Sequence, residues 1–364
     1  MTEQLITTLE DLRMSLELAV KVEHTTIPPY LCAMYTLHPG TNLGAHDIIR
    51  SVAMEEMLHM TLAANVLNAV GGHPDIESLK AVPTYPTQLP FNETFDINLA
   101  RFCPSTIETF LKIESPVATP TPMPLEECRR FSCKMLPKRL QGIYEQMRPK
   151  SETIGQFYEH IQEGLAYLVE TLGPEAVFTG GPETQIQPGT YYYGGGGRAI
   201  VVYDLITANE AIEMIKNQGE GVDATTIGDG DYAIYCEDWE PAHFYRFNQI
   251  LKGCYYQMGD TVTSGPTGPT FKVDWDAVYP MIDNPKTAGY PEGSPLREHS
   301  LAFNAIYQGL LDVLHEAYNG QPEALEPGVA LMYDLKYKAQ ALIKNPIGDG
   351  EHNAGPEFGP LDLA

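Results

Sequence analysis

The sequence predicts a mainly α-helical protein built on a four-helix bundle, with long irregular insertions and extra helices near its C-terminal end. Apolar residues recur every three or four positions in most of the longer segments, which is the period of a helix with one buried face. Proline- and glycine-rich stretches separate these segments and are too long to be simple hairpins. Carboxylates and histidines also lie on the apolar stripes, and they indicate what the bundle holds.

Helices are expected where the apolar period and the end signals agree. The first, at about 5–37, is disturbed at Pro28 and Pro29, because proline lacks the amide hydrogen and clashes with the preceding turn. A bend there would either open a channel beside Glu23 or simply fit the bundle. The other helices are expected at about 45–70, 105–114, 153–172, 208–217, 238–256, 297–319 and 324–344, with a further short segment at 125–135.

The connections suggest how the chain is organised. Residues 74–104 are rich in proline and are expected to form a long, irregular crossover, and residues 173–206 are rich in glycine, proline and tyrosine. Residues 1–260 are expected to form the bundle with these inserted loops. Residues 261–364 are expected to add a loop and a helical pair that pack on the bundle, giving one continuous domain.

The charge of the chain argues against several classes of partner. Its 364 residues include 48 acidic and 23 basic side chains, a formal net charge of −25. Such a surface repels phosphate backbones and anionic lipid, so neither nucleic acid nor a membrane is expected as a partner. No apolar run reaches the roughly 18 residues of a membrane-spanning helix, and the first residues lack the pattern of an export signal.

The six cysteines form no CxxC pair and no dense framework. In a chain of this length they indicate reduced thiols of a cytoplasmic protein. Metal ligation by thiolates is therefore not expected.

Acidic and histidine side chains occupy positions that the apolar pattern marks as buried. The stripe of the first helix runs through positions 5, 9, 12, 16, 19 and 23, and that of the second through 49, 52, 56, 59, 63, 66 and 70. The helices expected at 105–114 and 238–256 repeat the anomaly. The residues concerned are Glu23, Glu56, His59, Glu114, Glu240 and His243.

A pair of metal ions would satisfy all of these groups together. An unpaired buried carboxylate is costly, and no Lys or Arg lies on the same stripes. A glutamate three residues before a histidine puts both side chains on one helix face, and only His59 and His243 of the ten histidines have one. Two such pairs plus two further glutamates form the ligand set of ferritin-like di-iron and di-manganese bundles. Two iron ions are expected, with manganese as the alternative.

The fourth carboxylate is the least determined member of this set. Glu114 lies on its apolar stripe, although its helix is short. Glu159 and Glu163 lie on the longer helix at 153–172, but the first is well off the centre of the apolar face and the second is nearly opposite it. Glu114 is therefore preferred, Glu159 follows, and Glu163 is expected to be solvated.

Several neighbours of these residues could support the site. His24 is expected to lie behind the ligands or in solvent. Glu55 is expected either at the surface or as an acceptor for an N–H group of another helix. Tyr30, Tyr158 and Tyr245 are candidates for redox or supporting groups, although tyrosines at such positions are more often part of a core.

At these residues the chain resembles the VioB-like ferritin-like family, the group associated with iminophenyl-pyruvate dimer synthase domains. The resemblance spans nearly the whole chain, and its VEHTTIPPYL and EEMLHM segments are fairly specific. One departure is Gln156, where the family usually has a glutamate. The similar segments are LELAVKVEHTTIPPYL (17–32), VAMEEMLHM (52–60), TFLKIESP (109–116), TIGQFYEHIQEGL (153–165), EPAHFYRF (240–247) and the FN-to-L pattern from Phe303 through Leu310.

The resemblance implies a ferritin-like bundle with Glu23, Glu56, His59, Glu240 and His243 at metal-site positions. It also supports Glu114, because the family ends that helix in a glutamate before a proline. Well-known members join two indole-pyruvate imine units oxidatively and are much longer than this chain.

The expected function is that of an O₂-dependent oxidase or oxygenase that acts on a small, amino-acid-derived substrate in natural-product biosynthesis. The residues expected to carry catalysis are Glu23, Glu56, His59, Glu240 and His243. Oxidative imine coupling is one specific version. The alternatives are an iron-storage or peroxide-scavenging protein and a scaffold that has lost its metals. The sequence leaves the oligomeric state open.

Overall fold

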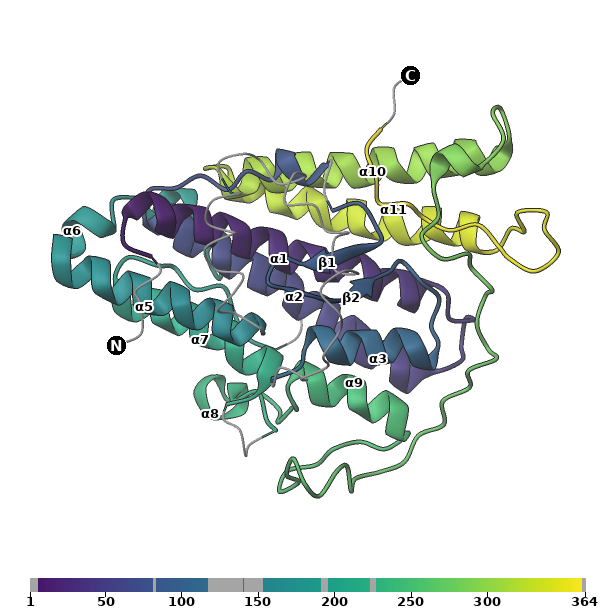
Figure 1. The fold of residues 1–364 in the computed structure, drawn as a ribbon, viewed down its shortest axis with the longest axis horizontal. Coiled ribbons are helices and arrows are strands. Elements are labelled where there is room, and N and C mark those ends of the chain that lie inside the picture. The colour runs from purple at the N-terminus through teal and green to yellow at the C-terminus, as the bar shows by residue number, and fades with distance from the viewer. Residues whose placement is uncertain are drawn as a thin grey trace.

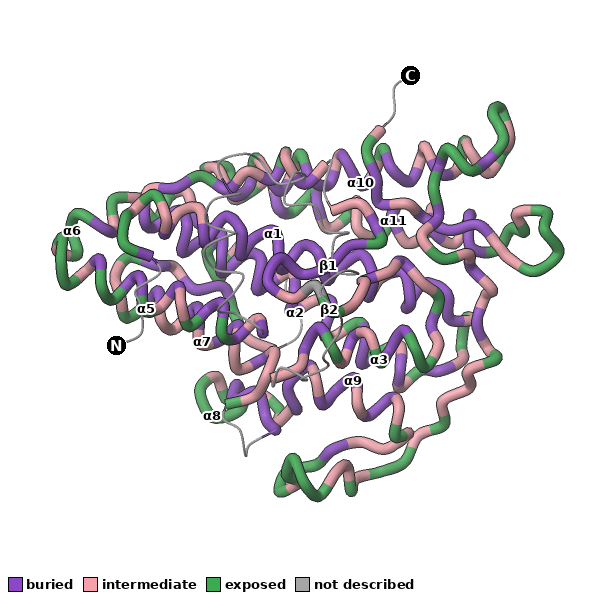
Figure 2. Tube along the Cα trace, viewed as in Figure 1, coloured by how far each residue is buried: buried purple, intermediate pink, exposed green. Residues whose placement is uncertain are grey.

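The computed structural model describes residues 6–80, 83–116, 140, 153–190, 196–222 and 227–361. Two long helices run side by side through the middle of the molecule (Figure 1). They are α1 (Leu9–Tyr35) and α2 (Leu43–Ala69). Thr8 caps α1 in a reciprocal capping box with Asp11. Both helices are buried over most of their length, on more than one face (Figure 2).

The other two members of the bundle are each made of two shorter helices. Along α1 lie α3 (Pro104–Ile113) and α5 (Ile154–Leu172), and along α2 lie α7 (Leu205–Glu220) and α9 (His243–Lys252). The pair α5 and α7 covers one half of the long helices, and the pair α3 and α9 covers the other half (Figure 1). The bundle is therefore interrupted at one level, between the two pairs.

The local sequence explains these interruptions. Pro116 follows α3 closely, which disfavours its continuation. Gly221 ends α7 with a φ of +97°, a conformation that favours glycine. Pro241 disfavours a helical conformation of Glu240, the residue before it, and α9 begins at His243.

A C-terminal pair of helices, α10 (Pro295–Tyr318) and α11 (Leu325–Ile343), packs on the opposite side of the long helices (Figure 1). Its buried side chains belong to the same hydrophobic core as those of α1 and α2. The other elements within the described ranges are short: α6 (Pro174–Val177), α8 (Asp231–Tyr235), 3₁₀ turns at Glu77–Lys80, Pro182–Thr184, Thr287–Gly289 and Pro322–Ala324, and a hairpin of β1 (Thr87–Leu89) and β2 (Asn92–Ile97). The strands are antiparallel, with Thr87 opposite Ile97.

The predicted helical bundle with insertions and extra C-terminal helices is confirmed, with three differences. The hairpin lies in a segment expected to be irregular. The helix expected at 238–256 is shorter and corresponds to α9, which begins at His243 and ends at Lys252. The first helix continues through Pro28 and Pro29. Because Pro29 has no amide hydrogen, the Thr25 carbonyl lacks its helical partner, and the Tyr85 hydroxyl donates to this carbonyl instead, at 2.8 Å. The segment expected at 125–135 lies outside the described residues.

Over the described part of the chain, no helix combines the length and the apolar character needed to cross a membrane.

Asn65 on α2 ties the segment between α6 and α7 to the bundle. Its amide donates to the carbonyls of Ile186 and Ile200 and accepts from the Ile186 amide, at 2.8 to 2.9 Å. Asn65→Ala leaves these buried backbone groups unpaired, so we expect the free energy of unfolding to fall by about 3 kcal/mol. Denaturant unfolding checks this against Asn345→Ala at the exposed end of α11, which is expected to cost no more than about 0.5 kcal/mol. Equal losses in the two variants would contradict the assigned role.

Candidate metal centre

Five of the predicted ligand residues meet at the level where the bundle is interrupted. Glu23 comes from the middle of α1, and Glu56 and His59 come from the middle of α2. Glu114 is the residue that follows α3, and His243 is the first residue of α9, so the two helix ends supply the remaining side chains. All five residues are 4% exposed or less.

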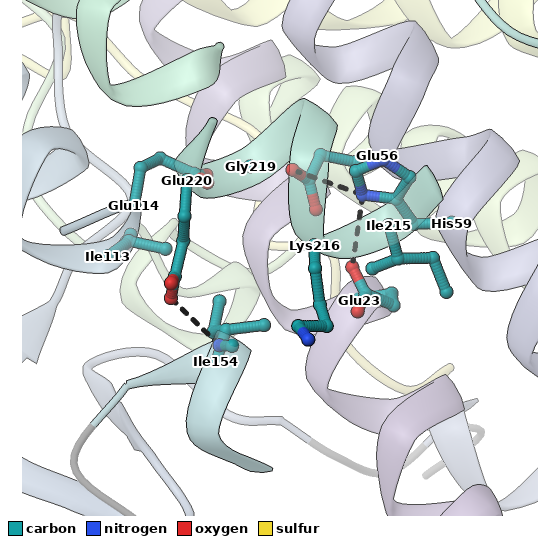
Figure 3. A pocket seen from close by; sticks show the side chains of 11 residues that line it. Glu23, Glu56, His59, Ile113, Glu114, Ile154, Ile215, Lys216, Gly219 and Glu220 are labelled. Atoms are coloured by element: carbon teal, nitrogen blue, oxygen red, sulfur yellow. Dashed lines mark hydrogen bonds and ion pairs between the residues drawn. The ribbon is translucent and has the colours of Figure 1, made fainter. Parts of the chain in front are cut away.

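Glu56 lies between the two histidines. Its Oε1 atom is 3.9 Å from His59 Nδ1 and 2.9 Å from His243 Nδ1. His59 Nδ1 is also 3.7 Å from Glu23 Oε2, and His243 Nδ1 is 3.5 Å from Glu114 Oε2. The site thus has two halves that share Glu56, and Figure 3 shows Glu23 and Glu56 pointing toward His59.

Each histidine is held at its other ring nitrogen. His59 Nε2 lies 2.8 Å from Gln218 Oε1, whose amide nitrogen donates to Asp231 at 2.6 Å. His243 Nε2 lies 2.8 Å from a carboxylate oxygen of Glu55. Because both partners are acceptors, the neutral form of each ring carries its hydrogen on Nε2 and its lone pair on Nδ1, facing the carboxylates.

The carboxylates are held in a similar way, each by one hydroxyl group. Tyr158 donates to Glu23 Oε1 at 2.6 Å, Thr26 donates to Glu56 Oε2 at 2.8 Å, and Tyr30 donates to Glu114 Oε1. The second oxygen of each carboxylate is the one that faces the histidines. Every side chain of the cluster is therefore fixed by one polar atom and offers another to the centre.

The charge of the cluster fits divalent cations. Burial, followed by the nearby Glu114 carboxylate, raises the pKa of Glu56 to about 7. Although burial alone would lower it, contacts with Glu114, Glu55 and Glu56 raise the pKa of His243 well above its ordinary value. Carboxylates buried this closely need positive charge, which protons or metal ions can provide.

One atom and one set of distances point to metal rather than to protons alone. His243 Nδ1 is buried and makes no hydrogen bond, although Glu56 Oε1 lies 2.9 Å from it. Glu56, His59 and His243 each offer a ligand atom, and these atoms lie within 4.8 Å of one another. Carboxylate oxygens and imidazole nitrogens suit iron or manganese.

Glu240 is not brought into this cluster. Its carboxylate is 45% exposed and lies 2.9 Å from Arg246 Nη2, on the outer side of that side chain. The prediction assumed that Glu240 and His243 share a helix, but Pro241 lies in an extended bridge with Gly228 and α9 begins at His243. The spacing of three therefore does not align the two side chains.

Arg246, which the apolar stripes do not mark, anchors the half of the site around His243. It is 2% exposed and bonds Glu55 at 2.7 Å, Asp229 at 3.0 Å and Glu240. Burial alone would raise the pKa of Glu55, but Arg246 and His243 lower it to about 2, so this carboxylate stays ionised. Glu55 is thus the acceptor for a neighbouring N–H group, one of the two roles expected for it.

The other candidates lie elsewhere. Glu159 and Glu163 are more than half exposed, so that Glu114 alone of the three alternatives reaches the cluster. His24 faces α10, where it bonds the Tyr307 hydroxyl at 2.5 Å. Tyr245 packs against Tyr256 in a separate small cluster.

A pocket reaches the cluster through the interruption between the helix pairs (Figure 3). Its outer walls combine apolar and charged side chains from three helix ends. Glu220, which the sequence patterns do not mark, accepts from the Gly155 amide at 2.8 Å. The wall residues are Ile113, Ile154, Gly155, Ile215, Lys216, Gly219 and Glu220, and the inner end is formed by Glu23, Glu56, His59 and Glu114.

The raised pKa of Glu56 predicts a specific pH dependence for the metal-free protein. The folded state keeps this proton up to about pH 7, whereas the unfolded chain releases it near 4.5, so stability falls as the pH rises between these values. We expect wild-type protein in chelator to lose stability relative to Glu56→Gln over this range. Denaturant unfolding at several pH values measures the difference, and parallel curves would contradict it.

Comparisons with known proteins agree with this architecture. Residues 16–252 match the family model described as Ferritin-like. The chain is 25% identical over 347 residues to dichlorochromopyrrolate synthase from Lentzea aerocolonigenes, a match that covers 87% of this chain but only 30% of that protein. A crystal structure of a ferritin-like protein from Caulobacter vibrioides superposes with a TM-score of 0.61 at 20% identity, covering 97% of this chain and 99% of that one. The chain therefore belongs to the ferritin-like family, and its predicted resemblance to the VioB-like group is confirmed.

Proposed function

We propose that the chain is an O₂-dependent oxidase or oxygenase that uses two iron ions, or two manganese ions, to act on a small amino-acid-derived substrate. One observation carries the proposal: five buried donor side chains each have one polar atom fixed and another facing a common centre. A structural ion pair needs no such arrangement, whereas a pair of metal ions does.

The two halves of the cluster define which residues would hold each ion. Glu23 and His59 would hold one ion, Glu114 and His243 would hold the other, and Glu56 would serve both. When bound, the metal pair supplies the redox capacity for O₂ reduction coupled to oxidation of an organic substrate.

The remaining residues shape the surroundings of the reaction. Burial, helped by the Glu23 carboxylate, raises the pKa of Tyr158 well above its ordinary value, so its hydroxyl keeps the proton that it donates to Glu23. Ile113, Ile154 and Ile215 give the pocket an apolar wall, which limits water near the metals and suits an organic substrate.

The similar proteins support a role in small-molecule biosynthesis. One of them is named as a synthase, and this chain spans less than a third of its length. Within that class we propose the oxidative joining of amino-acid-derived imines as the specific reaction, with a small molecule as the only partner the site requires.

An iron-storage or peroxide-scavenging role is the second candidate. The ferritin-like fold is compatible with it, but the C-terminal pair α10 and α11 and the long connections add much more than a storage bundle needs. Iron loading far above two ions per chain would favour storage.

Metal content is the first test of the proposal. Protein supplied with iron and manganese is expected to bind about two ions per chain, and after anaerobic reduction its absorption spectrum is expected to change on exposure to O₂. Protein that folds but binds no metal would exclude the proposed oxidase.

Two substitutions distinguish a carboxylate inside the cluster from one outside it. Glu114→Gln removes one charged ligand and is expected to lower metal affinity at least about 10-fold and to abolish oxygen-dependent activity. Glu240→Gln, at the partly exposed partner of Arg246, is expected to retain two metals. Glu163→Gln is the matched surface control. Metal analysis and O₂ consumption check all three variants, and full metal binding by Glu114→Gln would refute its assignment.

A further inference from the structure

The two histidines of the centre are supported by chemically different groups. Glu55, a carboxylate, accepts from His243 Nε2, and Gln218, a neutral amide, accepts from His59 Nε2, both at 2.8 Å. A carboxylate draws the Nε2 hydrogen more strongly than an amide does, which makes Nδ1 of the same ring a better metal donor. Nδ1 of His243 is therefore the stronger donor of the two.

The arrangement of the shared carboxylate adds to this difference. Glu56 Oε1 lies 2.9 Å from His243 Nδ1 but 3.9 Å from His59 Nδ1. Donor atoms around His243 are thus already drawn together, whereas those around His59 are more widely spaced. Less rearrangement is needed to close the His243 half around an ion.

Arg246 offsets only part of the negative charge behind His243. Its guanidinium is shared among Glu55 at 2.7 Å, Asp229 at 3.0 Å and Glu240 at 2.9 Å. One positive charge therefore serves three carboxylates. It also fixes the Glu55 carboxylate through a second, charge-assisted hydrogen bond.

The two halves also differ in how much of each lines the pocket. Its inner end is formed by Glu23, Glu56, His59 and Glu114, and His243 is not among the lining residues. The half that contains His59 is therefore the more open one. The half that contains His243 reaches the pocket only through Glu114 and the shared Glu56, and is called the closed half below.

We propose that the two metal positions are unequal: the closed half with His243 and Glu114 fills first and holds its ion tightly, and the open half with His59 and Glu23 fills second and exchanges its ion. Glu55 and Gln218 act as positioning residues that set this order through the histidines. The inference rests on the proposed function, since it assumes that the cluster binds two ions.

Anaerobic titration of the metal-free full chain with Co²⁺, followed by visible absorption, tests the order of binding without turnover. We expect two binding steps whose affinities differ at least about 10-fold. Glu55→Gln is expected to weaken the first step by about 10–100-fold and to leave the second unchanged. His59→Ala is expected to keep the tight step, and His243→Ala is expected to lose it.

A second variant, expected to strengthen binding at the other half, distinguishes the proposed effect from simple damage to the fold. Gln218→Glu combined with Asp231→Asn places a carboxylate behind His59 and keeps an amide to donate to it, so the second step should become tighter. A gain in affinity cannot arise from a damaged site. Asn345→Ala at the exposed end of α11 provides the control, with both steps as in the wild type.

The possible outcomes distinguish a failure of this inference from a failure of the proposed function. Two equal steps, or a Glu55→Gln variant that weakens both steps alike or only the second, would overturn the inference and leave a two-metal centre intact. Folded protein that binds no Co²⁺, Fe²⁺ or Mn²⁺ would overturn both the inference and the proposed function.

Discussion

The burial of three carboxylates at one level of the bundle is the constraint on which the rest of the structure depends. Glu23, Glu56 and Glu114 are each 4% exposed or less, where an unpaired charge is strongly unfavourable. Each is therefore given a hydroxyl donor at one oxygen and an imidazole near the other. The tyrosines and the threonine that supply these donors lie within the core, so the polar centre and its apolar surroundings are one structure.

The long helices and the interrupted ones contribute to this centre in different ways. α1 and α2 are continuous, and they present Glu23, Glu56 and His59 from helix interiors, where neighbouring turns limit their movement. Glu114 and His243 come from helix ends, which allows their side chains to enter from the side. The same interruption opens the pocket, so that access and ligation have a common structural cause.

The helical bundle and several of the residues in the cluster could be predicted from the sequence. Periodicity identified the long helices, and it marked Glu23, Glu56 and His59 because these residues break an apolar stripe on a continuous helix. It failed at Glu240, where Pro241 and an extended bridge delay the helix that the spacing assumed. Gln218 and Arg246 were missed for a different reason: their partners are 159 and 191 residues away, and pairing at that separation leaves no local pattern.

The walls of the pocket have a consequence for how this scaffold can diversify. They come from the ends of α3, α5 and α7, whereas the donors at the inner end are mostly held by helix interiors. Helix ends tolerate added or lost residues and altered caps far better than buried turns do. The start of α5 carries none of the donors or their hydrogen-bond partners at the centre except Tyr158 one turn further on, whereas the end of α3 carries Glu114 and the end of α7 carries Gln218. Related chains can therefore acquire new substrate preferences by lengthening, shortening or recapping the start of α5, while the chemistry at the centre is kept.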